Sequence, residues 1–295
     1  MKKLGKRAKE TGIAVIRSRA SRTARGSFYP RIVSLAPNVT SILVTLGARN
    51  TLVGVSRWCK DVADVGSLPQ LGDCWALSNP AVAGKAGTGP RDGGLDDAEK
   101  ILRLRPDYII GSVPLRGEVV GKLLQIPATF IALNPRSLRV IFRDIEFLGR
   151  LVNRTAETTA LIHQMEKTFA EIEQHASRNK IKQRVYCEAW SNPRISSPPW
   201  VAELVRIAGG RLAVPCGRRV TDEEVARAEP DVIILAWTAT GDRANPQSAL
   251  ANKDWRRVPA VQNERVVVIR DEWLNTPGPP LMKGARALFQ ALHGG

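Results

Sequence analysis

Short apolar runs alternate with segments of helical spacing from residue 31 onward. The runs are rich in Val, Ile and Leu, which predicts buried strands. Between them, apolar residues recur at the intervals typical of helices, so the alternation predicts an α/β fold with mostly parallel sheets. Residues 59–97 are rich in Gly, Pro, Ser and Asp without a period, and we expect a long loop there. The predicted strands of the first half are 31–35, 52–55, 108–111 and 129–133, and the predicted helices are 40–46, 96–105 and 118–124.

An internal repeat connects the two halves of the chain. Residues 99–110 read EKILRLRPDYII and residues 223–234 read EEVARAEPDVII, with six of the twelve positions identical. Each segment predicts a helix that ends at Pro-Asp and leads into a buried strand, because proline disfavours helical backbone in the residue before it. The repeat therefore predicts two similar lobes.

One long amphipathic helix is expected between the repeated segments. Residues 155–177 carry an apolar stripe that includes Leu161, Met165 and Phe169, with charged residues elsewhere. A helix of this length spans about 35 Å and would join the lobes as a rigid rod. The expected division is a basic leader at 1–30, an N-terminal α/β lobe at 31–137, connecting helices at 138–180, and a C-terminal α/β lobe with a closing helix at 181–295.

The composition is that of a soluble globular protein, with 43% hydrophobic and 24% charged residues. The longest apolar run is 232–237, far short of the roughly 20 residues that a membrane-spanning helix needs. The four cysteines form no Cys-x-x-Cys pair and the chain has three histidines, so we expect no metal site and no cofactor. No nucleophile elbow or paired carboxylates stand out, and we expect no enzymatic activity.

The net charge of +16 is unevenly distributed. Residues 1–30 contain nine basic residues against the single acid Glu10. We interpret this stretch as a disordered basic leader, with an early start codon and a targeting arm as alternatives. It lacks the apolar core of a secretory signal peptide. Since the remaining positive charge is spread along the chain, a nucleic-acid-binding face is not predicted.

Two α/β lobes bridged by one long helix, with RIVSLAPNVT at 31–40 and NTPGPP at 275–280, resemble the helical-backbone substrate-binding proteins of ABC importers. This family comprises receptors for cobalamin, haem and ferric siderophores. The resemblance covers about residues 31–293, and the segments ILAW at 234–237 and NTPGPP are most similar to cobalamin-binding members. It implies a monomer with a ligand cleft between the lobes, permease and ATPase partners, and a periplasmic or other extracytoplasmic location.

Candidate ligand residues follow from the strand ends. In open parallel sheets, ligands bind beyond the carboxyl ends of the strands. Four of the seven tryptophans fall there, although aromatic residues make up 5% of the chain. Flat indoles suit a large, partly apolar macrocycle, which favours cobalamin over a ferric siderophore, for which we expect an arginine cluster. The expected ligand-binding residues are Asn38, Arg57, Trp58, Ser112, Trp190, Trp237, Trp273 and Asn275.

The resemblance also implies one surface glutamate per lobe that docks onto arginines of the transporter. Glu99 and Glu223 match these positions, because each precedes the proline of its repeat by the same distance. The alternative is that each glutamate only favours the N-terminus of its helix.

Two alternatives to a cobalamin receptor remain open. The first keeps the fold and changes the ligand to haem or a ferric siderophore. The second is a cytoplasmic protein that binds an acidic partner through the basic leader, with affinity that falls steeply with salt.

Overall fold

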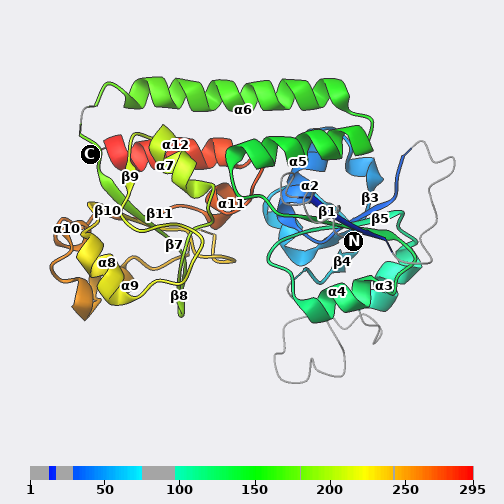
Figure 1. The fold of residues 1–295 in the computed structure, drawn as a ribbon, viewed down its shortest axis with the longest axis horizontal. Helices are drawn as coiled ribbons and strands as arrows, with labels where there is room; N and C mark the ends of the chain where they lie inside the picture. Colours follow the sequence, from blue (N-terminus) through cyan, green and yellow to red (C-terminus); the bar gives the residue numbers. More distant parts are fainter. Residues whose placement is uncertain (1–12, 18–28, 75–96, 180, 242, 295) are drawn as a thin grey trace, which may run out of the picture. The chain divides into compact units, whose positions relative to one another are not determined.

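The computed structural model describes residues 13–17, 29–74, 97–179, 181–241 and 243–294. The chain forms two compact units, the first from residues up to 135 together with 139–161, and the second from 136–138 together with 162 onward. Helix α6 (Thr155–Ala176) is continuous across this division, which falls between Leu161 and Ile162 (Figure 1). The structure thus confirms two α/β units and the long helix that the stripe at 155–177 predicted.

The first unit is built on a six-stranded sheet in the order β1-β6-β5-β2-β3-β4. All neighbouring strands are parallel except β1, which is antiparallel to β6. Helices α3 (Asp97–Leu104) and α4 (Gly117–Leu123) cover one face, and α2 (Pro37–Thr45) and α5 (Leu138–Leu151) cover the other (Figure 1). The strands are β1 (Ile13–Arg17), β2 (Ile32–Ser34), β3 (Leu52–Ser56), β4 (Gln70–Leu71), β5 (Tyr108–Ser112) and β6 (Thr129–Leu133).

The core of the first unit follows the alternation of side chains along these strands. Val33, Ile109 and Phe130 point to the face covered by α3 and α4, where they pack with Ile101 and Leu123. The strands are buried on both faces, which explains their nearly continuous apolar runs.

Strand β1 departs from the expected disordered leader. Its residues pair with β6 from Ile13 opposite Leu133 to Arg17 opposite Thr129. The run IAVIR is rich in β-branched residues, which favour strands. The same run is too short to be the apolar core of a signal peptide. The leader expectation is therefore wrong for residues 13–17, and its remaining parts at 1–12 and 18–28 lie outside the described residues.

The second unit contains a five-stranded sheet in the order β11-β10-β7-β8, with β9 paired to β7. Strand β8 is antiparallel to β7, and the other pairs are parallel. Helices α7 (Val201–Ile207) and α12 (Leu281–His293) lie on one face, and α8 (Asp222–Ala228), α9 (Gln247–Leu250) and α10 (Pro259–Gln262) lie on the other (Figure 1). The strands are β7 (Arg184–Ser191), β8 (Arg194–Ser196), β9 (Arg211–Leu212), β10 (Val232–Leu235) and β11 (Val266–Val268).

The sequence repeat corresponds to a helix-to-strand connection that we call the joint, and the first copy lies in the first unit. After α3, Arg105 takes a positive φ of 46° and Pro106 stops the helix. The carboxylate of Asp107 then accepts a hydrogen bond of 2.9 Å from the backbone N–H of Arg31, next to the first residue of β2. The Arg31 side chain donates to the carbonyls of Leu104 and Arg105 at the end of α3. The end of α3 and the starts of β5 and β2 are thereby held together.

The second unit repeats this joint. Helix α8 ends at Glu229 with a φ of 44°, and Pro230 follows. The carboxylate of Asp231 accepts from the backbone N–H of Arg184 at 2.7 Å, and the Arg184 guanidinium pairs with both Asp231 and Glu229. A left-handed non-glycine residue costs about 1–2 kcal/mol, which these charge-assisted bonds offset. The repeat thus preserves a connection that holds the end of a helix to the starts of two neighbouring strands, β5 and β2 in the first unit and β10 and β7 in the second.

Candidate functional site

The carboxyl ends of β7 and β10 lie side by side in the second unit. The backbone N–H of Ala236 donates to the carbonyl of Glu188 at 2.8 Å, and that of Thr238 donates to the carbonyl of Ala189 at 3.0 Å. The chain beyond β10 therefore continues along β7. Trp237 and Trp190 belong to these two adjacent segments, so the structure brings these two predicted ligand residues to one edge of the sheet.

Trp190 is the more exposed of the two indoles. Its side chain is 43% exposed at the end of β7. Its Nε1 donates to the carbonyl of Asn192 at 2.8 Å, which satisfies the polar atom within its own turn. The ring therefore offers mainly apolar surface to its surroundings.

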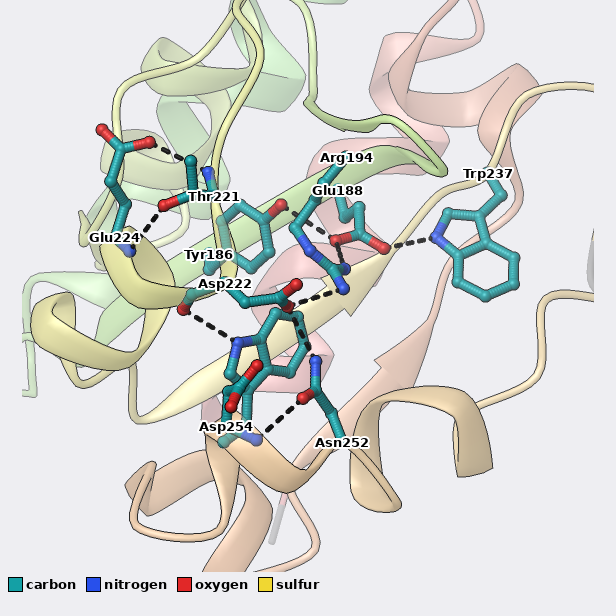
Figure 2. Close-up of polar contacts among 10 residues, drawn as sticks. Tyr186, Glu188, Arg194, Thr221, Asp222, Glu224, Trp237, Asn252 and Asp254 are labelled. Carbon is teal, nitrogen blue, oxygen red and sulfur yellow. Dashed lines mark hydrogen bonds and ion pairs between the residues drawn. The ribbon is translucent and has the colours of Figure 1, made fainter.

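Trp237 is anchored by a buried carboxylate. Its Nε1 donates to Oε1 of Glu188 at 2.9 Å (Figure 2). Glu188 is fully buried, and its other oxygen, Oε2, accepts from the hydroxyl of Tyr186 at 2.9 Å and from Nη1 of Arg194. Burial raises the pKa of Tyr186, and the nearby Glu188 charge raises it further, so the hydroxyl remains a donor.

Arg194 connects this carboxylate to the start of α8. Its Nη2 lies 2.9 Å from Oδ1 of Asp222, the first residue of that helix (Figure 2). The guanidinium carbon lies 4.2 Å from the ring centroid of Trp255. Burial alone would lower the pKa of Arg194, but the charge of Glu188 and the hydrogen bond to it outweigh burial and raise this pKa. The arginine therefore stays charged.

Asn275 supports the main chain next to Trp237. Its Nδ2 donates to the carbonyl of Ala236 at 2.7 Å, while its Oδ1 is buried with no hydrogen-bond partner among the described residues. The sequence predicted a ligand contact at this position. In the structure one amide hydrogen holds the main chain just after β10, and the ligand contact of Asn275 stays a prediction.

A second carboxylate holds the loop that follows Trp237. Asp271, the first residue of the short helix α11 (Asp271–Leu274), accepts from the backbone N–H groups of Ala239 and Gly241, each at 3.2 Å. Both of these loop residues have positive φ. Burial raises the pKa of Asp271 to about 6, and the charge of Glu272 adds to the rise, against the two backbone donors.

Trp273 lies on the same short helix and packs differently. The Nζ of Lys283, on α12, lies 6.0 Å from its ring centroid. The backbone carbonyl of Trp273 lies so close to Gly284 that a Cβ at this glycine would overlap it. The indole is partly buried against α12, and no described contact joins it to Trp237.

The corresponding edge of the first unit holds the other predicted ligand residues. Asn38 is the second residue of α2 and is buried, with no hydrogen-bond partner for its Nδ2 among the described residues. Arg57 and Trp58 begin the short helix η2 (Arg57–Asp61), which packs against α2. The Trp58 ring is 37% exposed, and its Nε1 donates to Asp73 at 2.8 Å. Ser112 ends β5 and is buried.

A buried hydroxyl and thiol cluster, which sequence reasoning missed, fixes η2. Thr40 Oγ1 donates to Ser34 Oγ at 2.8 Å and also lies 3.0 Å from the sulfur of Cys59. Ser56 Oγ lies 3.2 Å from the same sulfur. Burial raises the pKa of the Cys59 thiol, so it remains protonated and unreactive. The cluster therefore serves structure.

The two candidate docking glutamates lie in the first turns of equivalent helices. Glu99 belongs to α3 and Glu223 to α8, and both are exposed. Helix α8 opens with a capping box in which Thr221 and Glu224 satisfy each other's backbone N–H groups. A hydrogen bond with Thr221 lowers the pKa of Glu223, so this side chain carries a negative charge at neutral pH.

The described part of the chain contains neither a metal-ligand cluster nor a membrane-spanning helix. No group of three or more His, Cys, Asp or Glu residues there could hold a metal ion. None of the helices in these residues has the length and apolar character to cross a membrane. All four cysteines are free.

Sequence reasoning missed the residues that hold the indole site in the second unit. Glu188, Arg194 and Asp271 have no motif, and two of the contacts are distant in sequence: Trp237 lies 49 residues from Glu188, and Ala239 lies 32 residues from Asp271. One local signal was present for Glu188, since a charged residue in an otherwise apolar strand needs buried donors.

The chain is similar to known proteins along most of its length. Residues 32–273 match the family model described as periplasmic binding protein. The vitamin B12-binding protein of Vibrio cholerae serotype O1 is 26% identical over 266 residues, 84% of this chain and 84% of that protein. The uncharacterized ABC transporter substrate-binding lipoprotein YvrC of Bacillus subtilis is 21% identical over 276 residues, 89% of this chain and 80% of that protein.

Solved structures share the fold. The periplasmic vitamin B12 binding protein BtuF of Vibrio cholerae superposes with a TM-score of 0.66 at 23% identity, covering 89% of this chain and 96% of that one. The periplasmic heme binding protein HutB of Vibrio cholerae gives a TM-score of 0.70 at 18% identity, covering 90% and 100%.

Replacing Asp271 tests the buried carboxylate beneath the indole loop. The folded pKa of about 6 exceeds the ordinary value of 3.8, so the unfolded chain releases this proton first as the pH rises. The stabilisation is complete below about pH 4 and is lost as the pH rises through about 6, a change of about 3 kcal/mol. We expect Asp271→Asn to lack this loss in urea unfolding measured at pH 4 and pH 7. Asp254→Asn, at an exposed aspartate of the same unit, is the control, and equal pH dependence of wild type and Asp271→Asn would contradict the assignment.

Proposed function

The chain belongs to the periplasmic binding protein family, and from this premise we propose that it binds a corrinoid, cobalamin, for delivery to an ABC importer. Members of this family are binding proteins and not enzymes. The function of the site is therefore to recognise and release a ligand without changing it chemically.

The observation that carries the proposal is the pair of indoles at one edge of the second sheet. Trp190 and Trp237 both have their polar Nε1 bonded within the protein. What each ring can still offer is its flat apolar face. An aromatic face contributes about 0.5–1.5 kcal/mol of stacking beyond the burial of area, which suits a broad macrocycle with an apolar surface.

The curated relatives support this choice of ligand. Several of those that align over most of this chain are named vitamin B12-binding or cobalamin-binding proteins. Haem is the second candidate, because it is also a flat macrocycle and heme-binding structures share this fold. The third candidate ligand is a ferric siderophore, bound by a receptor of the same fold.

The partners follow from the same premise. A substrate-binding protein of an ABC importer works outside the cytoplasmic membrane and transfers its ligand to permease and ATPase subunits. We propose Glu99 and Glu223 as the two charges that meet basic residues of the transporter. Exposed charges of this kind fix orientation and speed encounter more than they add affinity.

Titration with candidate ligands tests the proposed function. We expect purified protein to bind cyanocobalamin in isothermal titration calorimetry, in preference to haemin and a ferric hydroxamate. The double substitution Trp190→Ala with Trp237→Ala should weaken binding by more than about tenfold, because two stacking faces are lost.

Ile181→Ala is the matched control, since it removes an exposed apolar side chain of the same unit. If haemin or the ferric hydroxamate binds and cyanocobalamin does not, cobalamin is the wrong ligand and the compound that binds takes its place in the proposal. Unchanged affinity in the tryptophan double variant would remove these residues from the site.

Charge reversal tests the docking glutamates. We expect Glu99→Lys with Glu223→Lys to reduce ligand uptake through the reconstituted importer by about tenfold or more, with ligand affinity unchanged, because charges of the wrong sign oppose encounter. Glu166→Lys, at an exposed glutamate of α6, is the control. Wild-type uptake by the double variant would show that these residues do not dock.

A further inference from the structure

We propose that Glu188 is a positioning residue for ligand binding, whose buried carboxylate holds the indole of Trp237 in one orientation before a ligand arrives. The proposal rests on the proposed function, because it names the group that prepares one face of that site. Glu188 itself is fully buried and acts through the tryptophan.

The geometry around Glu188 leaves little freedom to the carboxylate. One oxygen accepts from Nε1 of Trp237, at 2.9 Å, and the other accepts from Tyr186 and Arg194 (Figure 2). The three donors come from different parts of the second unit: β7, β8 and the second residue after β10. Rotation of the carboxylate would break several hydrogen bonds at once, so its position defines where the indole N–H can lie.

Arg194 keeps the carboxylate of Glu188 in place. The arginine is held by Asp222 through Nη2 and lies over the ring of Trp255. Asp222 is held in turn by Nδ2 of Asn252 at 2.8 Å, and its carbonyl accepts from Nε1 of Trp255 at 3.1 Å. A buried ion pair with this many partners is costly to break from one side, which makes it a rigid support.

Glu188 also holds the main chain next to Trp237. The carbonyl of Glu188 accepts from the N–H of Ala236, the residue just before Trp237, and Asn275 binds the carbonyl of Ala236. Backbone and indole are thus fixed relative to one strand residue. Ordering one large side chain in advance is worth about two- to tenfold in ligand affinity, because binding no longer has to restrict it.

The first test needs no ligand. The full chain is labelled with 5-fluorotryptophan, and the ¹⁹F resonance of Trp237 is assigned by its loss in Trp237→Phe. Glu188→Met combined with Arg194→Met removes the acceptor without leaving a buried charge unpaired. We expect the Trp237 resonance to shift or broaden in this variant, while Tyr186→Phe, which removes another donor to the same carboxylate, leaves it in place. An unchanged Trp237 resonance in the folded double variant would overturn the proposal.

The second test is a double-mutant cycle on ligand affinity. We expect Glu188→Met with Arg194→Met to weaken cyanocobalamin binding by about two- to tenfold in the wild-type background and to change nothing further in the Trp237→Phe background. Independent, multiplying effects would show that Glu188 does not act through the indole. Trp237→Phe keeps a smaller aromatic ring and removes the Nε1–H donor, so it remains informative if the double variant does not fold: wild-type affinity in Trp237→Phe would also overturn the proposal.

The two tests separate the two claims. If no candidate ligand binds the wild-type protein, the proposed function fails, and the ¹⁹F result still decides whether Glu188 positions Trp237. If ligand binds and the ¹⁹F resonance does not respond, the function stands and the positioning role fails.

Discussion

A carboxylate buried inside a sheet is tolerated only when donors surround it, and this constraint organises the second unit. The carboxylate of Glu188 accepts hydrogen bonds from Tyr186 on its own strand, from Arg194 on the next strand and from Trp237 in the chain beyond β10. Because Trp237 lies 49 residues from Glu188, satisfying this one carboxylate fixes the chain beyond β10 against β7 and β8. The indole that we propose as a ligand contact is therefore part of the structural support of the unit.

A second constraint is shared by both units and explains the visible sequence repeat. In each, a left-handed residue follows the helix and precedes a proline, and the next aspartate accepts from the backbone N–H of an arginine at the start of the neighbouring strand, β2 or β7. Few residue types satisfy these conditions together, so Pro106-Asp107 and Pro230-Asp231 remain alike while the helices before them differ. The surface glutamates Glu99 and Glu223 keep the same spacing to this joint, which is why they occupy equivalent first turns.

Local patterns predicted most of the regular structure and little of the site's chemistry. The apolar run at 129–133 coincides with β6, and the stripe at 155–177 coincides with α6 to within one residue. These elements were predictable because the side chains that a strand or helix buries recur at short, fixed intervals along the sequence. The rule of strand ends placed Trp190 and Trp237 together, but it did not predict that Nδ2 of Asn275 binds the carbonyl of Ala236. Partners such as Trp237 for Glu188 depend on strand order, which spacing along the chain does not encode.

The central claim is that Trp237, held by Glu188, forms a prepared surface for a flat ligand. A crystal structure of the complete chain with bound cyanocobalamin tests it most directly. The account predicts the corrin ring in contact with the Trp190 and Trp237 indoles, with Nε1 of Trp237 still bonded to Glu188. A ligand bound away from both rings, or a Trp237 side chain rotated off the carboxylate, would contradict it.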